Sequence, residues 1–243
     1  MGVELNVAST TYLGNPFTFL DCPGSLELIQ GTFDASIGAD AAVVVCEADP
    51  SKAVALQPLL HFFEERQIPR LIFVNKIDKL VGSVEEMVDA LQVASQSPLI
   101  LRQYPIIDGE SVTGYIDLPS GRFFQYKTDK ASEKVELSAD LLDRFKEARY
   151  QMLEKVSDFN EELMERLLED KDPDNSEAYE VLKNSFQSSE IVPVVFGAAE
   201  SENGVRRLLK MLRHEVAGPK VAATRIGLKN DEQTLSQVLK TYY

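Results

Sequence analysis

The residues with the most specific chemistry in this sequence are three polar side chains that directly follow an apolar run: Asn75, Lys76 and Asp78. A carboxylate at position 78 can accept two hydrogen bonds from the adjacent ring N–H and exocyclic amino group of guanine. Adenine presents the opposite polarity at those atoms, so it would leave the carboxylate unpaired and bind much more weakly. Lys76 can lay its aliphatic stem across the base, and Asn75 can tie the loop to neighbouring loops. The alternative for this stretch is an ordinary helix cap.

Two other short stretches also follow apolar runs and could approach the same ligand. Asp21 comes directly after one run, and an acid in such a place can hold a metal ion, usually through water. Gly24 follows it, and a glycine there lets a backbone N–H approach a phosphate. Gly197, Ala198 and Ala199 follow another run, and a loop of small residues lets a backbone amide reach a purine carbonyl. Taken alone, the stretch at 21–24 could equally be a simple turn, and the stretch at 197–199 is unspecific.

Four further polar residues are expected to have structural roles. Glu47 and Asp49 follow another apolar run and are expected to cap the next helix rather than bind metal. His61 lies beside two phenylalanines in a helical pattern, and His214 lies near a predicted helix end, where its charge would favour the helix dipole. Neither histidine has a catalytic partner in view, so neither is predicted to be catalytic.

The apolar runs that precede these stretches are short enough to be strands: Pro16–Leu20, Asp40–Cys46, Arg70–Val74 and Ile191–Phe196. Helical patterns lie between and after the runs: Leu26–Ile37, Val54–Arg66, Val84–Ala94 and Val205–Val216. Continuous apolar strands indicate burial on both faces, and strand–helix alternation predicts a doubly wound α/β fold, whose ligands bind at the carboxyl ends of the strands. The residues around Gly14–Asn15 also predict an antiparallel hairpin at a sheet edge, between Val3–Leu13 and Pro16–Leu20.

One interval is too long for a single connecting helix, which predicts an inserted α+β subdomain. Its expected strands are Leu99–Ile107, Val112–Asp117 and Arg122–Tyr126, followed by helices from Ser138 onward. The helical part, residues 139–190, has 7 Lys and Arg against 15 Asp and Glu, a net charge of −8, which is either a solvated face or a docking surface for a basic partner. The predicted units are an incomplete core (1–97), the insertion (98–190), a return to the core (191–218), and a linker with an extended tail that could begin another domain (219–243).

The composition excludes several classes of protein. Hydrophobic residues are 44% and charged residues 26% of the 243 residues, and the mean hydropathy is −0.15, so the chain is expected to fold and not to enter a membrane. With 25 Lys and Arg against 39 Asp and Glu, the net charge of −14 argues against a broad phosphate-binding surface and against direct nucleic-acid binding. Cys22 and Cys46 are expected to be reduced thiols in the cytoplasm, with one disulfide as the alternative.

In combination, D-x-P-G at 21–24, N-K-x-D at 75–78 and G-A-A at 197–199 resemble the guanine-nucleotide-binding domain of translational GTPases. The stretches LRQYPI (101–106), GYIDL (114–118) and LMERLLED (163–170) resemble the subdomain inserted in elongation factor G. The resemblance covers about Thr11 to Pro219, and several of these phrases favour an elongation-factor-G-like branch over the standard factor.

This resemblance implies a P-loop-NTPase-like fold that binds GTP or GDP with a magnesium ion (Mg²⁺), and a cytoplasmic factor whose GTP hydrolysis drives a conformational cycle on the ribosome. Asp21 would approach Mg²⁺ through water and Gly24 would lie near the γ-phosphate, within a second switch at 24–35. The side chains at 75, 76 and 78 would recognise guanine, supported by Ala198 and by the amide of Ala199. The insertion could meet the ribosomal stalk protein.

The sequence departs from that family in two respects. It contains no Gly-Lys pair, so the phosphate loop G-x-x-x-x-G-K-[ST] is absent, and with it the strand that would lie in the middle of the sheet. The chain is therefore expected to be an inactive later portion of the GTPase domain, with the missing strand replaced by Leu235–Leu239 or by a neighbouring chain. Ser25 stands where the family has a water-positioning histidine, which puts hydrolysis by even the full-length parent in doubt. The alternative function is a degenerate GTPase-like module that binds a protein partner without hydrolysing nucleotide.

Overall fold

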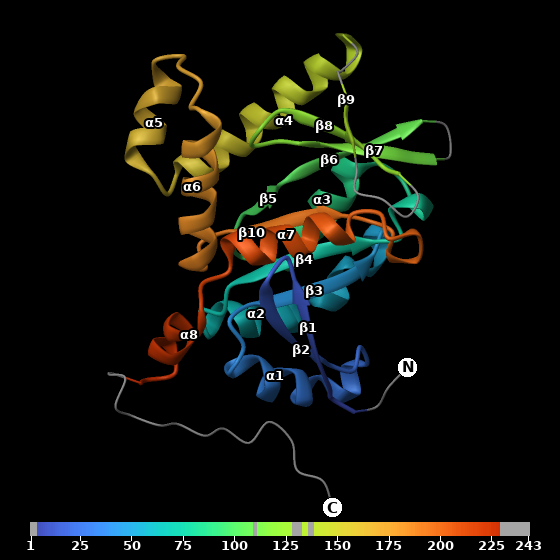
Figure 1. Ribbon diagram of the computed structural model, residues 1–243, viewed down its shortest axis with the longest axis vertical. Helices are drawn as coiled ribbons and strands as arrows, with labels where there is room; N and C mark the ends of the chain where they lie inside the picture. Colours follow the sequence, from blue (N-terminus) through green and yellow to red (C-terminus); the bar gives the residue numbers. More distant parts are fainter. Residues whose placement is uncertain (1–3, 109–110, 128–132, 136–138, 229–243) are drawn as a thin grey trace, which may run out of the picture.

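A computed structural model describes residues 4–108, 111–127, 133–135 and 139–228, and it has the predicted α/β architecture (Figure 1). Four strands form a parallel sheet in the order β3-β4-β10-β5. Their bounds are Ala42–Glu47 (β3), Arg70–Asn75 (β4), Val192–Phe196 (β10) and Leu99–Leu101 (β5). Because the strands are parallel, their carboxyl ends share one edge, where the loops at 75–78 and 197–199 begin.

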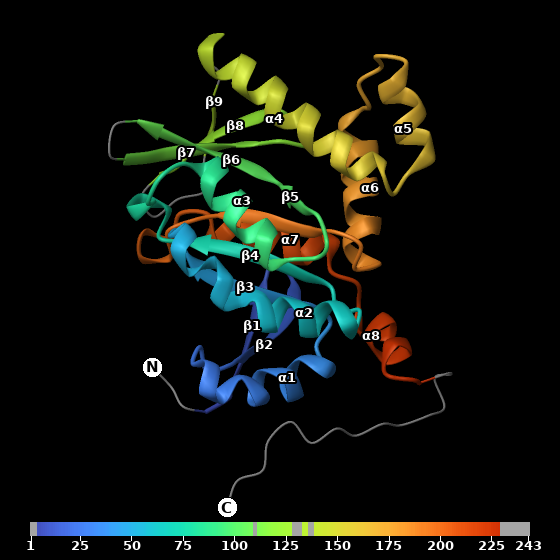
Figure 2. The same ribbon diagram turned by 180° about the vertical axis from the view of Figure 1, so that it is seen from behind.

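Helices cover both faces of this sheet (Figures 1 and 2). Successive side chains of a strand point to opposite faces, so a continuous apolar strand needs a covering layer on each face. The helices near the sheet are α1 (Ile29–Ile37), α2 (Gln57–Glu65), α3 (Val84–Ala94) and α7 (Val205–Glu215). On one face, Ile72 and Val74 of β4 pack with residues of α2 and α3. On the other, Leu71 and Phe73 pack with α7 and with the helices of the insertion. Arg70–Val74 of β4 and all of β10 are buried, which confirms the predicted burial of these two runs on both faces.

The N-terminal hairpin forms as predicted but is not hydrogen-bonded to the parallel sheet. Its strands, β1 (Asn6–Tyr12) and β2 (Asn15–Asp21), form a separate antiparallel sheet. Among the described residues no strand pairs with the second edge of β2 or of β3, and Val45 of β3 is 58% exposed. The predicted burial on both faces is therefore wrong for the run in β2, which lies outside the parallel sheet, and holds in part for β3, where Val43 and Val44 pack into the two cores but Val45 is exposed. Leu235–Leu239, proposed to take the vacant place, lies outside the described residues.

The insertion departs from prediction at Arg102, which divides the expected strand Leu99–Ile107 in two. The part before Arg102 is β5 of the main sheet, and the part after it is β6 (Gln103–Asp108) of a second sheet with β7 (Ser111–Asp117), β8 (Arg122–Gln125) and β9 (Glu133–Val135). The Arg102 side chain is fully buried and forms two hydrogen bonds with Glu215, of 2.6 and 2.8 Å. The helices that follow are α4 (Ala139–Ser157), α5 (Glu161–Leu168) and α6 (Asn175–Gln187).

The segment after α7 also differs from expectation. Residues 219–243 were predicted as a linker with an extended tail, but Pro219–Arg225 form the helix α8. Proline fits the first turn of a helix because the N–H that it lacks has no partner there. Arg225 donates hydrogen bonds to the carbonyl oxygens of Ile37 and Ala39, at 3.3 and 2.5 Å, and so joins α8 to the end of α1. No helix among the described residues is both long and apolar enough to cross a membrane.

Candidate functional site

Asn75 joins the two loops that leave β4 and β10 at the carboxyl edge of the sheet. Its Oδ1 accepts a hydrogen bond of 2.9 Å from the backbone N–H of Lys76 and another of 2.9 Å from that of Ala199. A second link runs from the N–H of Ile77 to the carbonyl oxygen of Gly197, at 3.0 Å. The prediction that Asn75 ties its loop to a neighbouring loop is therefore confirmed.

Asp78 lies at the outer end of this loop, within the short helix Ile77–Lys79. Its side chain is exposed and has no hydrogen bond or ion pair with any described residue, so both carboxylate oxygens can accept hydrogen bonds from a ligand. The chain can turn here because Lys76 adopts a left-handed conformation, with φ of 59°. Asp78 is thus presented at the upper rim of the sheet beside residues 197–199.

Lys76 has a partner that the sequence did not suggest. Its ammonium group forms an ion pair with Glu47, which ends β3 and also pairs with Lys52. In the parallel register of β3 and β4, Glu47 lies directly opposite Asn75. This register places the Glu47 carboxylate within reach of Lys76, the next residue of the chain. Glu47 therefore does not cap the next helix as predicted. Asp49 does, since it accepts hydrogen bonds of 3.1 and 2.7 Å from the backbone N–H and hydroxyl of Ser51.

Glu47 is expected to have a pKa far below the ordinary value of a glutamate. Hydrogen bonds from Lys52 and then from Lys76 lower its pKa from 4.5 to about 2. Since the pKa of the folded state is lowered, this carboxylate stabilises the protein above pH 4.5, and the contribution is lost as the pH falls towards 2. NMR of the side-chain carboxyl carbon should give this pKa, and Lys52→Met and Lys76→Met should each raise it. An ordinary glutamate pKa in the unaltered chain would contradict the ion pairs.

The loop that follows β2 is not joined to the two loops above. Asp21 is exposed, and within the described chain no hydrogen bond or ion pair links residues 21–25 to residues 75–78 or 197–199. Ser25 begins the short helix Leu26–Leu28 without capping it, and its hydroxyl bonds to Glu27 instead. The structure therefore brings together the predicted base-recognition residues but does not connect them to Asp21 and Gly24.

The Ala198 and Ala199 amides have partners other than the one expected. The N–H of Ala198 donates to the carbonyl oxygen of Asn203 at 2.9 Å, and that of Ala199 donates to Asn75. In this structure neither amide is free to reach a purine carbonyl, and their role is to fix the loop. Gly197 is required here for space, because a Cβ on it would lie 2.5 Å from the Asn203 carbonyl oxygen and 2.5 Å from the Phe73 ring. The Asn203–Gly204 turn that makes this contact was missed by the sequence reasoning.

A magnesium site is not complete in this part of the chain. Mg²⁺ at nucleotide sites is held by one or two carboxylates together with water and phosphate oxygens. Asp21 is one exposed carboxylate, and no group of three or more potential metal ligands of the types His, Cys, Asp and Glu occurs among the described residues. The sequence also lacks the Ser or Thr of a phosphate loop. The described residues thus supply a single carboxylate, and the other ligands of a magnesium ion would have to come from water and nucleotide phosphates.

Comparison with known proteins identifies the family. The Elongation factor Tu GTP binding domain family matches residues 1–217. This chain belongs to that family. The elongation factor Tu-type GTP-binding domain includes the Asn75–Asp78 loop and the whole inserted segment, so the family predicted from the sequence is confirmed.

Individual proteins that are similar to this chain agree with the family assignment. The chain is 43% identical over 245 residues to an elongation factor G-like protein of Synechocystis sp. (strain ATCC 27184 / PCC 6803 / Kazusa), with all of this chain and 37% of the relative covered. A crystal structure of a protein from Thermus thermophilus has the same fold, with a TM-score of 0.78 and 24% identity, covering 93% of this chain and 33% of that one. The chain thus spans about a third of the length of these relatives.

Proposed function

We propose that this chain is the guanine-recognising portion of an elongation-factor-G-like GTPase. The observation that carries the proposal is the loop in which Asn75 is held from two sides while the carboxylate of Asp78 has no partner among the described residues. A carboxylate presented in this way can accept hydrogen bonds from the ring N–H and amino group of guanine together. The Lys76 ammonium group is paired with Glu47, which leaves the aliphatic stem of the lysine to cover the base.

The same reasoning predicts weak nucleotide binding and no hydrolysis by this chain alone. Most of the affinity of such sites comes from contacts to phosphates, and the sequence has no G-x-x-x-x-G-K-[ST] loop to make them. Gly24 would lie near a γ-phosphate, and Asp21 would approach Mg²⁺ through water only where nucleotide phosphates supply its other ligands. Serine at position 25 is a poorer group than histidine for positioning a water molecule.

We place the activity of the whole protein on the ribosome, in the cytoplasm, where GTP binding and hydrolysis would drive a conformational cycle. The support is membership of the elongation factor Tu-type family and the likeness to an elongation factor G-like protein. The acidic helices α4 to α6 of the insertion offer a surface for a basic partner, and the ribosomal stalk protein is the partner we infer.

The test compares how strongly different purine nucleotides bind to this chain. Saturation-transfer NMR should show GDP and guanosine bound weakly and ADP not bound, because the adenine base leaves Asp78 unpaired. Guanosine should compete with GDP, since the base makes the contact. The variant Asn75→Ala should lose the GDP signal, because removing the amide breaks the hydrogen bonds that hold the 75–78 loop. Equal signals from ADP and GDP would overturn base recognition, and no signal from any guanine ligand would favour the protein-binding alternative.

A further inference from the structure

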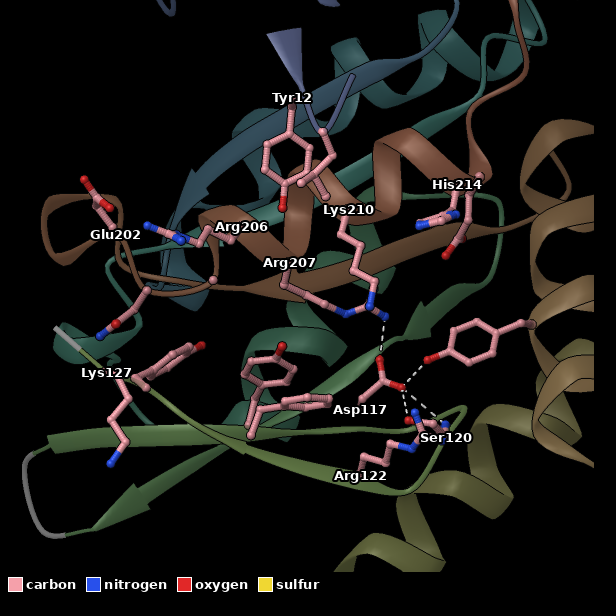
Figure 3. A pocket seen from close by; sticks show the side chains of 18 of the residues that line it. Tyr12, Asp117, Ser120, Arg122, Lys127, Glu202, Arg206, Arg207, Lys210 and His214 are labelled. Carbon is pink, nitrogen blue, oxygen red and sulfur yellow. Dashed lines mark hydrogen bonds and ion pairs between the residues drawn. The ribbon is translucent and has the colours of Figure 1, made fainter. Parts of the chain in front are cut away.

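A cleft of about 1170 Å³ opens between α7, α6 and the sheet of the insertion, and no part of the proposed function uses it (Figure 3). Tyr12 and Leu13, at the tip of the N-terminal hairpin, also line it. The residues at 200–204 adjoin the 197–199 loop, but Asn75, Lys76 and Asp78 do not line the cleft. Nucleotide recognition and occupation of this cleft can therefore be tested separately.

Unpaired cations face this cleft from three elements. Arg206 and Lys210 lie four residues apart on α7, so they share one face of the helix, and Lys210 extends towards the insertion sheet (Figure 3). Lys183 of α6 and Arg122 of β8 line the same space. None of these four side chains has an ion pair or hydrogen bond with any described residue. In a chain of net charge −14, such a concentration of free positive charge is a local feature of this cleft.

The floor of the cleft is aromatic and electrically neutral. Tyr115 stacks on Phe124 with ring centroids 5.3 Å apart and contacts Tyr126 at 5.6 Å. The buried Asp117 between these rings and α7 is neutralised by Arg207, whose Nη2 lies 2.5 Å from its Oδ1. Tyr179 also donates a hydrogen bond to Asp117 (Figure 3). An occupant therefore meets apolar rings below and free cations at the sides.

We propose that this cleft binds an acidic peptide segment of a partner protein, one in which carboxylate side chains alternate with apolar ones. The cleft is larger than the usual site of a small ligand. Its lining also includes the exposed carboxylates Glu180, Glu200 and Glu202. These would repel a nucleic acid, which has one charge on every nucleotide, whereas a peptide can place neutral residues opposite them. The favoured occupant is thus anionic at some positions and apolar at others.

The test uses a short fluorescein-labelled peptide in which glutamate alternates with leucine and phenylalanine. Fluorescence anisotropy at low salt should show binding that weakens as salt is added. The double variant Arg206→Glu/Lys210→Glu should weaken binding by about tenfold or more, and Glu200→Lys/Glu202→Lys should strengthen it. The matched control Lys146→Glu/Lys155→Glu, on α4 outside the cleft, should have little effect. Circular dichroism checks that each variant is folded.

Three outcomes would overturn the proposal. The first is absence of binding by the acidic peptide, or equal binding by a matched peptide with lysine in place of glutamate. The second is binding that the α7 and α4 charge reversals weaken equally, because the site would then lie elsewhere. The third is tighter binding of a single-stranded oligonucleotide than of the peptide, which would assign the cleft to nucleic acid. Each peptide titration is repeated with GDP present. Because Asn75, Lys76 and Asp78 do not line the cleft, peptide binding should be the same with and without GDP, whether or not GDP itself binds.

Discussion

Replacing Asp78 with asparagine is expected to change the base preference of this chain from guanine to xanthine. The asparagine amide group would face the exocyclic amino group of guanine donor to donor, leaving a polar group unpaired, at a loss of about 10- to 100-fold in affinity. Xanthine has a carbonyl oxygen at that position and can accept from the same amide. Saturation-transfer NMR with GDP and xanthosine diphosphate in competition measures the change.

This substitution has favourable controls. The Asp78 side chain is exposed and has no partner among the described residues, so its loss should leave stability unchanged, which thermal unfolding checks. Asp89→Asn makes the same chemical change on α3, away from the loop, and should leave the preference for guanine intact. A variant Asp78→Asn that still prefers GDP would show that this carboxylate does not recognise the base.

Replacing Glu215 with alanine should cause a large loss of stability, about 3–5 kcal/mol in the free energy of unfolding. Arg102 is 0% exposed, and Glu215 on α7 is the carboxylate that pairs with it through two hydrogen bonds. Truncating Glu215 leaves the Arg102 guanidinium buried without a counter-charge. The resulting loss of unfolding free energy is larger than the net stabilisation that the ion pair provides. Urea unfolding followed by circular dichroism gives the free energy.

A second pair of variants separates the lost charge from the lost packing. Arg102→Leu/Glu215→Leu removes both charges and fills the space, so it should be less destabilised than Glu215→Ala. Glu215→Gln retains the shape and one acceptor and should lie between Glu215→Ala and the unaltered chain. If Glu215→Ala unfolds at the same urea concentration as the unaltered protein, the buried pair does not hold the insertion to α7.

The sheet and its candidate loop were predictable because their signals are local. The apolar runs that became β4 and β10 are continuous, and a capping box at Ser83 and Glu86 starts α3 where the sequence predicted it. Parallel strands then place the residues after Val74 and after Phe196 at the same edge without further information. For the same reason, the base-recognition role that we propose for N-K-x-D could be inferred before any contact was known.

Contacts between distant segments could not be predicted in this way. Asn75 meets the Ala199 amide across 124 residues of chain, and the strand predicted at 99–107 is divided at Arg102 because Glu215, 113 residues later, holds the arginine in the interior. The sequence determined the types of most elements, their order and the grouping of polar side chains at residues 75–78, since these depend on neighbouring residues. Only the tertiary structure decided the separate hairpin sheet, the Glu47–Lys76 pair and the cleft beside α7, because each depends on which surfaces meet when the chain is folded.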